Sequence, residues 1–241
     1  MKSNDYFAFK QFTINQKRCA HKVGTDGVLL GAWADLNFPV PKEHYRGLDV
    51  GAGTGLIALM LAQRRTNLLM DAVEIDEKAY YQCLDNKCNS PFGDRVFPKL
   101  FAFQDFQPDT LYDLIVSNPP YFTNSMKSPD YQRNEARHND GLSIKILIKK
   151  SLQMLCDTGR IALILPVENA KELDLQITAR NLQILRRTDV ITVEGQEPKR
   201  FMIELAHYKS DNPQFNSLTL ETGTHKRTAG YQELTKDFYL D

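Results

Sequence analysis

From Arg46 onward, short apolar runs alternate with amphipathic stretches, and this alternation constrains the fold more than any other feature of the chain. The apolar runs read as strands: YRGLDV, LLMDAVEI, RVFPKLF, YDLIVS, RIALILP, LQILRRTDVITVE and KRFMIELAHYK. Several stretches between them, such as GLIALMLAQRR and SIKILIKKSLQMLC, have the periodicity of helices. Strands joined by helices form a mostly parallel sheet that helices cover on both faces. We therefore predict an α/β fold with a seven-stranded sheet that includes an antiparallel closing strand.

Residues 1–45 precede this region and have a different pattern. FAFKQFTINQ alternates as a strand or hairpin does, and TDGVLLGAWADL reads as a short helix capped by Thr25 or Asp26. The length of 241 residues fits one domain with small additions. We therefore predict an N-terminal extension over residues 1–45 that packs on a main domain over residues 46–241.

Composition and cysteine usage narrow the class of protein. The chain has 30 basic and 30 acidic residues, so its net charge gives no general argument for nucleic-acid binding. The 4 cysteines have neither C-x-x-C nor metal-ligand spacing, which indicates reduced thiols and no metal site. The start, MKSNDYFAFK, has no signal-like run, and no segment approaches the roughly 20 apolar residues of a membrane span. We expect a soluble cytoplasmic protein, and nothing in the sequence implies a stable protein partner.

A glycine turn follows the first strand of the alternating region. LDVGAGTGLIA places Gly51, Gly53 and Gly55 beyond the carboxyl end of a strand, where parallel sheets bind their ligands. Glycines let the backbone approach a ligand closely because they have no Cβ. The dinucleotide fingerprint G-x-G-x-x-G requires a glycine at position 56, which is Leu56 here. The turn therefore predicts a ligand site and disfavours a nicotinamide-linked oxidoreductase.

Carboxylates surround this turn. Asp49 precedes it, and Glu74 ends the second strand 19 residues after Gly55, the usual reach to a ribose diol. Asp105 follows the third strand and is expected to face an adenine amino group. Carboxylates without a lysine at the loop suit ammonium and sulfonium charges better than phosphates, so we predict S-adenosyl-L-methionine as the cofactor. The predicted cofactor-binding residues are Asp49, Gly51, Gly53, Gly55, Glu74, Asp105 and, if it orders the pocket edge rather than capping the helix, Asp26.

The fourth strand ends in SNPPY. Asn118 and Pro119 each precede a proline, so both are expected to be extended and stiff. The Asn118 amide oxygen and the Pro119 carbonyl are acceptors, which suit a planar group that carries N–H donors. Accepting both N–H bonds of an amino group on such a planar ligand would favour a pyramidal nitrogen with a free lone pair, and the Tyr121 ring would stack on the planar group. We predict Asn118, Pro119 and Tyr121 as the catalytic residues.

Two of these motifs together resemble a known class of enzyme. DVGAGTG with VEID resembles the cofactor half of class I methyltransferases, and NPPY is similar to the amino-methyltransferase motif N/D-P-P-Y/F. The resemblance covers about Arg46 to Pro166 and implies a Rossmann-like fold. Enzymes with N-P-P-Y motifs methylate adenine N6, guanine N2, cytosine N4 or the glutamine side chain of release factors. The motif therefore does not identify the methyl acceptor.

The N-terminal segment narrows the acceptor. FKQFTINQKRCAHKVGTDGVLLGAWA resembles the opening of the bacterial tRNA(Val) adenine-37 N6-methyltransferase family, with K-Q-F-x-I-x-Q and then K-V-x-T-D-G-x-L-L-G-A-W. His21 stands where a methionine is common, and YQELTKDFYL is similar to the family's last helix. The resemblance implies methylation of N6 of the adenine next to the anticodon in a valine tRNA. The alternatives are an N-methyltransferase for rRNA guanine N2 or a protein glutamine, whose members usually bring a separate N-terminal domain, and a binding protein without the chemistry, which Asn118 and Tyr121 disfavour.

The tRNA must be held by the domain's own surface, since no extra RNA-binding module is visible. Basic residues gather in the first 30 residues and between Thr123 and Lys150. Phosphate contacts are predicted for the basic side chains and base stacking for the aromatic ones. The residues concerned are Lys127, Arg133 and Arg137 for phosphates, and Phe122 and Tyr131 for bases.

Overall fold

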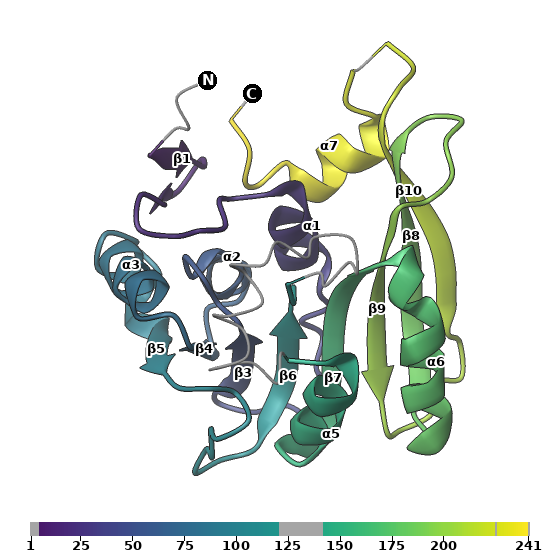
Figure 1. Cartoon of the computed structure of the whole chain (residues 1–241), viewed down its shortest axis with the longest axis horizontal. Coiled ribbons are helices and arrows are strands. Elements are labelled where there is room, and N and C mark those ends of the chain that lie inside the picture. Colours follow the sequence, from purple (N-terminus) through teal and green to yellow (C-terminus); the bar gives the residue numbers. More distant parts are fainter. Residues whose placement is uncertain (1–4, 121–141, 225, 241) are drawn as a thin grey trace, which may run out of the picture.

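A computed structural model of the chain describes residues 5–120, 142–224 and 226–240. The main sheet of this part has eight strands in the order β10-β8-β9-β7-β6-β3-β4-β5 (Figure 1). The strands are β3 (Tyr45–Val50), β4 (Leu68–Glu74), β5 (Val96–Leu100), β6 (Tyr112–Ser117), β7 (Leu155–Pro166), β8 (Gln183–Val193), β9 (Arg200–Ala206) and β10 (Gln214–Glu221). Neighbouring strands run parallel except at β9, which is antiparallel to both β7 and β8. The predicted mostly parallel sheet with an antiparallel strand is confirmed.

The predicted strand count was one too low. The strand that sequence analysis missed is β10, which lies at the edge of the sheet and pairs in parallel with β8. Its first half, Gln214–Ser217, is exposed and mostly polar, so it lacks the apolar pattern that marks a buried strand. An edge strand is held by backbone hydrogen bonds to one neighbour and needs little apolar surface of its own. Hydrophobic periodicity therefore could not reveal it.

Helices cover both faces of the sheet. The helices are α1 (Thr25–Trp33), α2 (Leu56–Arg64), α3 (Glu77–Cys88), α5 (Ile144–Leu152), α6 (Ala170–Ala179) and α7 (Ala229–Thr235), with the short turns η1 (Gly93–Arg95) and η2 (Val167–Asn169). Helices α5 and α6 lie on the face that is in front in Figure 1 and pack with one cluster of buried side chains. A second cluster, on the opposite face, includes residues of α1, α2, α3 and α7. Each face therefore has its own core.

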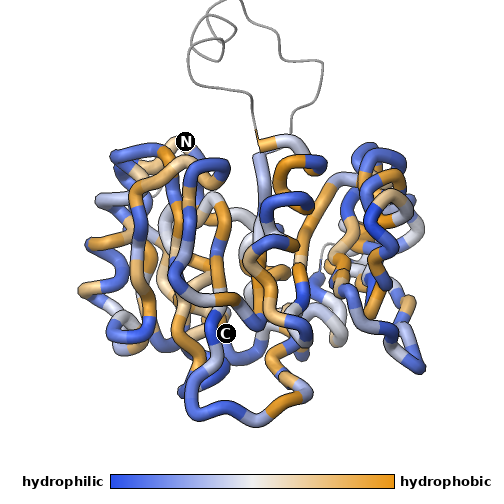
Figure 2. The backbone as a smooth tube through the Cα atoms, turned by 90° about the horizontal axis from the view of Figure 1, so that it is seen from below, coloured by the Kyte–Doolittle hydropathy of each residue, from blue (hydrophilic) through white to orange (hydrophobic). Residues whose placement is uncertain are grey.

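The strands that separate the two cores are buried on both sides. Leu114 and Val116 of β6 belong to one cluster and Ile115 to the other, as the alternation of side chains along a strand requires. In Figure 2 the hydrophobic residues concentrate in the inner segments and the hydrophilic residues at the outer turns. Within the described ranges, no helix combines the length and the apolar character that crossing a bilayer requires.

The N-terminal hairpin predicted for FAFKQFTINQ is present. Strand β1 (Tyr6–Ala8) pairs with β2 (Thr13–Asn15) in antiparallel register. An aromatic cluster joins the hairpin to the C-terminal residues, with ring centroids of Phe9 and Tyr239 6.1 Å apart. The Lys10 backbone N–H also donates to the Phe238 carbonyl at 2.8 Å. The two ends of the chain therefore pack together over one face of the main domain.

The register of the central strands brings their carboxyl ends to one edge. Val50 of β3 lies opposite Val73 of β4 and Ser117 of β6, and Glu74 lies opposite Leu100 of β5. The residues that follow these strands, including the glycine turn and the Asn118 corner, therefore gather at the same edge. This edge is where open α/β sheets bind their ligands.

Candidate active site

The three glycines of the turn all have backbone conformations that disfavour other residues. Their φ angles are 72° at Gly51, 55° at Gly53 and 79° at Gly55. A Cβ at Gly51 or Gly53 would meet no atom of the other described residues within 4 Å, apart from its two chain neighbours, so both positions border open space in this part of the chain. A Cβ at Gly55 would lie 2.6 Å from Cys83 Sγ, which means that this glycine allows α2 and α3 to pack closely. The first two glycines therefore border a space that a ligand can enter.

The N–H groups of the turn are used inside the protein. Those of Gly51 and Ala52 donate to the Val73 carbonyl, at 2.9 and 3.1 Å. That of Gly53 donates to Glu74 Oε2 at 2.7 Å. Phosphate-binding turns instead point free N–H groups at the ligand. This turn is therefore poorly suited to a phosphate, as the surrounding carboxylates predicted.

Glu74 has a second role in addition to the predicted one. Its Oε1 atom accepts from the N–H groups of Ile75 and Asp76, both at 2.8 Å, and the residue is buried. Together with the bond from Gly53, these contacts fix the carboxylate beside the glycine turn. Each carboxylate oxygen can accept more than one hydrogen bond, so capacity for hydroxyl donors remains. The glutamate thus orders the turn and keeps acceptor sites beside it.

Asp49 is a fully buried carboxyl group beneath the turn. Its Oδ2 accepts from the Ala58 N–H at 3.1 Å, whereas no donor among the described residues reaches Oδ1. Burial, with the nearby Glu74 charge as a smaller cause, raises the pKa of Asp49 from 3.8 to about 7, against the lowering effect of the Ala58 bond. A buried acceptor without a donor is costly unless a ligand supplies one. Asp49 is therefore suited to a ligand that carries N–H donors and positive charge.

Asp105 lies in the turn after β5 and is exposed. Its N–H donates to the Ala102 carbonyl at 3.0 Å, and Phe103 and Phe106 on either side are buried. Two exposed apolar side chains lie nearby, Ile75 (57% exposed) directly after Glu74 and Phe101 (50% exposed) at the end of β5. Sequence analysis missed both, although an apolar residue next to a strand-ending acid is a readable signal. They offer an apolar surface at the edge where a nucleoside base would lie.

The Asn118 corner adjoins the glycine turn across two neighbouring strands. Ser117 is fully buried, and its Oγ donates to the Val50 carbonyl at 2.8 Å, one residue before Gly51. Asn118 is partly exposed and Pro119 is buried, so the amide lies at the surface of a firmly packed corner. The structure thus places Asn118 and Pro119 at the same sheet edge as the glycine turn, because β6 lies next to β3, and Glu74 lies one strand further on, at the end of β4. Outside the described residues lie Tyr121, Phe122, Lys127, Tyr131, Arg133 and Arg137.

The helix-cap interpretation of Thr25 and Asp26 is wrong. Gly24 is the N-cap of α1, and no side chain caps the helix. Asp26 lies in the first turn instead, and its Oδ2 pairs with Arg200 Nε of β9 at 2.7 Å. Because β9 begins beside the start of this helix, the Asp26 carboxylate pairs with Arg200 of β9 and does not cap the helix. The pair holds α1 at the carboxyl edge of the sheet.

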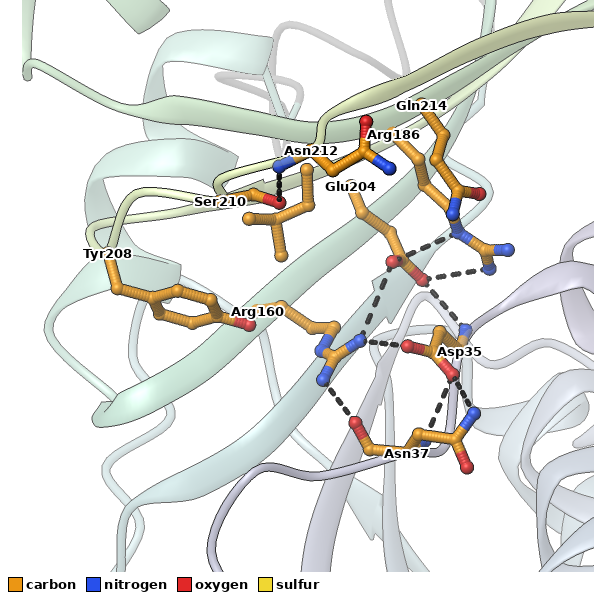
Figure 3. Close-up of a pocket in the computed structure, with 10 residues that line it drawn as sticks. Asp35, Asn37, Arg160, Arg186, Glu204, Tyr208, Ser210, Asn212 and Gln214 are labelled. Atoms are coloured by element: carbon orange, nitrogen blue, oxygen red, sulfur yellow. Dashed lines mark hydrogen bonds and ion pairs between the residues drawn. The ribbon is translucent and has the colours of Figure 1, made fainter.

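A hollow of about 400 Å³ lies away from the glycine turn (Figure 3). Its lining comes from the segment after α1, from β7, β8 and β9, from the β9–β10 connection and from the start of β10. Arg160 pairs with Asp35 at 2.5 Å, and Glu204 pairs with Arg186 at 3.1 Å. These opposite charges satisfy one another, so the cluster holds the end of α1 on the sheet. Among the described residues, no group of three His, Cys, Asp or Glu side chains could hold a metal ion.

Known proteins with a similar sequence or a similar fold identify the class of this protein. Residues 36–193 match the family model of the methyltransferase small domain. A predicted O-methyltransferase from Agrobacterium tumefaciens has a similar structure, with a TM-score of 0.66 and 17% identity over 88% of this chain and 96% of that one. A glycopeptide N-methyltransferase complexed with S-adenosyl-L-methionine has a TM-score of 0.54, with 12% identity over 78% of this chain and 100% of that one. The fold and the site define a class I methyltransferase.

Sequence relatives give the family. Proteins named tRNA1(Val) (adenine(37)-N6)-methyltransferase are 45% identical in Parabacteroides distasonis and 43% identical in Phocaeicola vulgatus, over 99% of both chains in each case. A protein of the same name in Trichodesmium erythraeum is 43% identical over 97% of both chains. The chain belongs to the family of tRNA1(Val) (adenine(37)-N6)-methyltransferases.

Proposed function

We propose that this protein transfers a methyl group from S-adenosyl-L-methionine to N6 of adenine 37 in tRNA1(Val), with Asn118 and Pro119 as acceptors for the reacting amine. The main structural support is the juxtaposition of the Asn118 corner with the glycine turn, joined by the bond from Ser117 Oγ to the Val50 carbonyl. Near-identical length and 45% identity to a relative of that name support the substrate. Because tRNA is the substrate, we expect the protein in the cytoplasm. Recovery of the protein in the membrane fraction of lysed cells would contradict this.

The residues at the turn fit the cofactor. Asp49 Oδ1 lacks a donor among the described residues and suits an ammonium group, and Glu74 keeps acceptor capacity for ribose hydroxyls. The open space at Gly51 and Gly53 leaves room for the chain between them. Ile75 and Phe101 can cover the faces of an adenine ring, with Asp105 accepting from its amino group. When bound, S-adenosyl-L-methionine supplies an electrophilic methyl group on a sulfonium.

The corner acts by orientation. The Asn118 amide oxygen and the Pro119 carbonyl accept the two N–H bonds of adenine N6, which favours a pyramidal nitrogen whose lone pair is free. Two prolines hold these acceptors in extended backbone, so the amine is aimed without further ordering. Alignment of this kind is worth about 7–11 kcal/mol in favourable reactions. Tyr121 is proposed to stack on the target base, which must be unpaired to reach the corner.

Cofactor affinity is expected to depend on pH through Asp49. The folded pKa of about 7 means that the carboxyl is mostly protonated at pH 6, whereas an ammonium ligand requires the ionised form. Binding below pH 7 must then release a proton, so affinity rises with pH and levels off above about 7.5. We expect the dissociation constant to be about tenfold larger at pH 6 than at pH 7.5. Calorimetric titration at several pH values should show this change of the dissociation constant in wild type and no change in Asp49→Asn. An equal pH dependence in both proteins would show that Asp49 does not bind the ammonium group.

RNA is proposed to bind through charge on the domain's own surface. Lys127, Arg133 and Arg137 are the proposed phosphate contacts and Phe122 a stacking contact, with exposed Lys17 and Lys22 of the N-terminal segment beside the pocket. Removing one phosphate-binding side chain should reduce the slope of log affinity against log salt by about 0.7–0.9. Titrations from about 50 to 200 mM salt should show a smaller slope in Lys127→Gln/Arg133→Gln/Arg137→Gln than in wild type. Equal slopes would remove these residues from the RNA site.

A methylation assay tests whether tRNA is the substrate and which nucleoside receives the methyl group. Total tRNA from cells that lack the protein is incubated with it and with methyl-labelled cofactor, and then digested to nucleosides. We expect label in N6-methyladenosine, and in valine tRNA alone when single isoacceptors are used. Label in guanosine would favour the guanine N2 alternative, and label in no nucleoside would favour a protein glutamine.

A further inference from the structure

One side chain joins the glycine turn to the N-terminal segment. Asn86 of α3 is fully buried, and its Nδ2 donates both to the Thr54 carbonyl at 2.9 Å and to the Asn15 carbonyl at 2.8 Å. Its Oδ1 accepts from the Asn15 N–H, also at 2.8 Å. Thr54 lies between Gly53 and Gly55, and Asn15 ends β2. One amide group therefore fastens two segments that are far apart in the sequence.

Further buried amides extend this attachment. Gln82, one turn earlier on α3, accepts from the Arg18 N–H at 3.2 Å. Gln16 accepts from the Val23 N–H at 2.7 Å and so closes the loop between β2 and α1 on itself. Gln82 and Gln16 are both buried. Residues 13–24, which we call the N-terminal wall, are thus held by polar side chains as well as by the burial of Ile14 in the main core.

The N-terminal wall also contains a buried thiol. Cys19, at its centre, is buried, and burial together with the charges of Glu74 and Asp76 raises its pKa to about 11. Its backbone N–H donates to the Gln16 carbonyl at 3.3 Å. Asn15 of the wall and Thr54 of the glycine turn bind the same Asn86 amide, which places this part of the wall beside the turn.

We propose that Asn86 is a positioning residue for methyl transfer, which fixes the glycine turn and the N-terminal wall relative to one another and so completes the cofactor pocket. Its amide uses both donors and its acceptor and adds no charge beside Asp49 and Glu74, which an aspartate would. The residue touches neither substrate nor cofactor, and it acts through Thr54 and Asn15. This inference rests on the proposed function, because it assumes that the turn binds S-adenosyl-L-methionine.

The test compares Asn86→Ala with two controls. Asn89→Ala removes an exposed amide at the end of the same helix, which donates to the Asp85 carbonyl within α3. Leu173→Ala removes a buried side chain from α6, on the opposite face of the sheet, and lowers stability without touching the site. Calorimetry with S-adenosylhomocysteine gives the dissociation constant, thermal unfolding without ligand gives stability, and steady-state kinetics separate KM from kcat.

We expect Asn86→Ala to weaken ligand binding about tenfold or more, since it removes three hydrogen bonds that hold the pocket together, with a matching rise in the cofactor KM. The kcat at saturating cofactor should stay within about threefold of wild type, and both controls should bind within about twofold. The proposal would be overturned if Asn86→Ala unfolded at a lower temperature, as we expect for Leu173→Ala, but bound S-adenosylhomocysteine with wild-type affinity. A wild-type protein that binds no S-adenosylhomocysteine would instead refute the proposed function.

A wild-type experiment covers the case in which Asn86→Ala does not fold. Trypsin can cut the N-terminal wall after Lys17, Arg18 and Lys22, which are all exposed. Cuts at these sites, identified by mass spectrometry, should slow by about threefold or more when S-adenosylhomocysteine is present, because a ligand that binds the closed pocket holds the wall in place. Unchanged cutting at saturating ligand would show that the wall is not coupled to the pocket.

Discussion

Replacing Asn118 with alanine is expected to lower kcat by about 10²–10³-fold, the range seen when one preorganised hydrogen-bonding group is removed from an active site. The variant lacks an acceptor for an amine proton, so the adenine nitrogen keeps its lone pair delocalised and is no longer aimed. Cofactor binding should stay within about twofold of wild type, because the corner contacts the cofactor turn through Ser117 and the backbone of β3.

Single-turnover kinetics with saturating tRNA and cofactor would measure this decrease. Asn118→Asp keeps an acceptor at the same place and should retain more activity than Asn118→Ala. Asn212→Ala, at a position remote from the corner, serves as the matched control. A variant Asn118→Ala that turns over at a near wild-type rate would show that the amide does not orient the amine.

Replacing Glu74 with glutamine is expected to weaken S-adenosyl-L-methionine binding by about 100-fold or more. Hydrogen bonds to a charged group contribute roughly 1.5–3 kcal/mol each, and the glutamine would lack the charge and turn an N–H group toward backbone donors. Three backbone N–H groups, from Gly53, Ile75 and Asp76, now point at this carboxylate. The substitution is therefore expected to disturb the glycine turn as well as the proposed ribose contact.

Calorimetry on the purified variant would measure the dissociation constant. Glu77→Gln provides the control, since Glu77 is an exposed acid in the first turn of α3, three residues further on. We expect Glu77→Gln to bind within about twofold of wild type. Equal affinities of Glu74→Gln and wild type would exclude Glu74 from the cofactor site and leave it only the role of ordering the turn.

Much of the site could be predicted because it is local in the sequence. The glycine turn, the acid that ends β4 and the proline-stiffened corner each consist of a few adjacent residues at a strand end. Parallel strands place such ends at one edge, so the order of strands and helices was enough to predict that Asp49, Glu74 and Asn118 lie at the same edge of the sheet. Ile75 follows the acid that ends β4, so the sequence carried a signal for it that was not used, whereas the exposure of Phe101 depends on how the residues after β5 fold.

Other features depend on contacts between distant segments. The ion pair of Asp26 with Arg200 joins residues 174 positions apart, and it is this contact, and not a helix cap, that engages Asp26. Asn86 joins β2 to the glycine turn, but in the sequence it is one polar residue among several on α3. The polar first half of β10 is a strand only because β8 offers it a free edge.

The sequence by itself determined the class of fold and the local conformation of the glycine turn and of the two-proline corner, since these follow from hydrophobic periodicity and from the backbone limits of glycine and proline. Only the tertiary structure decided which polar groups are satisfied. It left Asp49 Oδ1 without a donor among the described residues and gave Asn86 three hydrogen bonds. The physical reason is that burial and the partners of a polar group are set by segments that meet only after folding, whereas local conformation is set by neighbours along the chain.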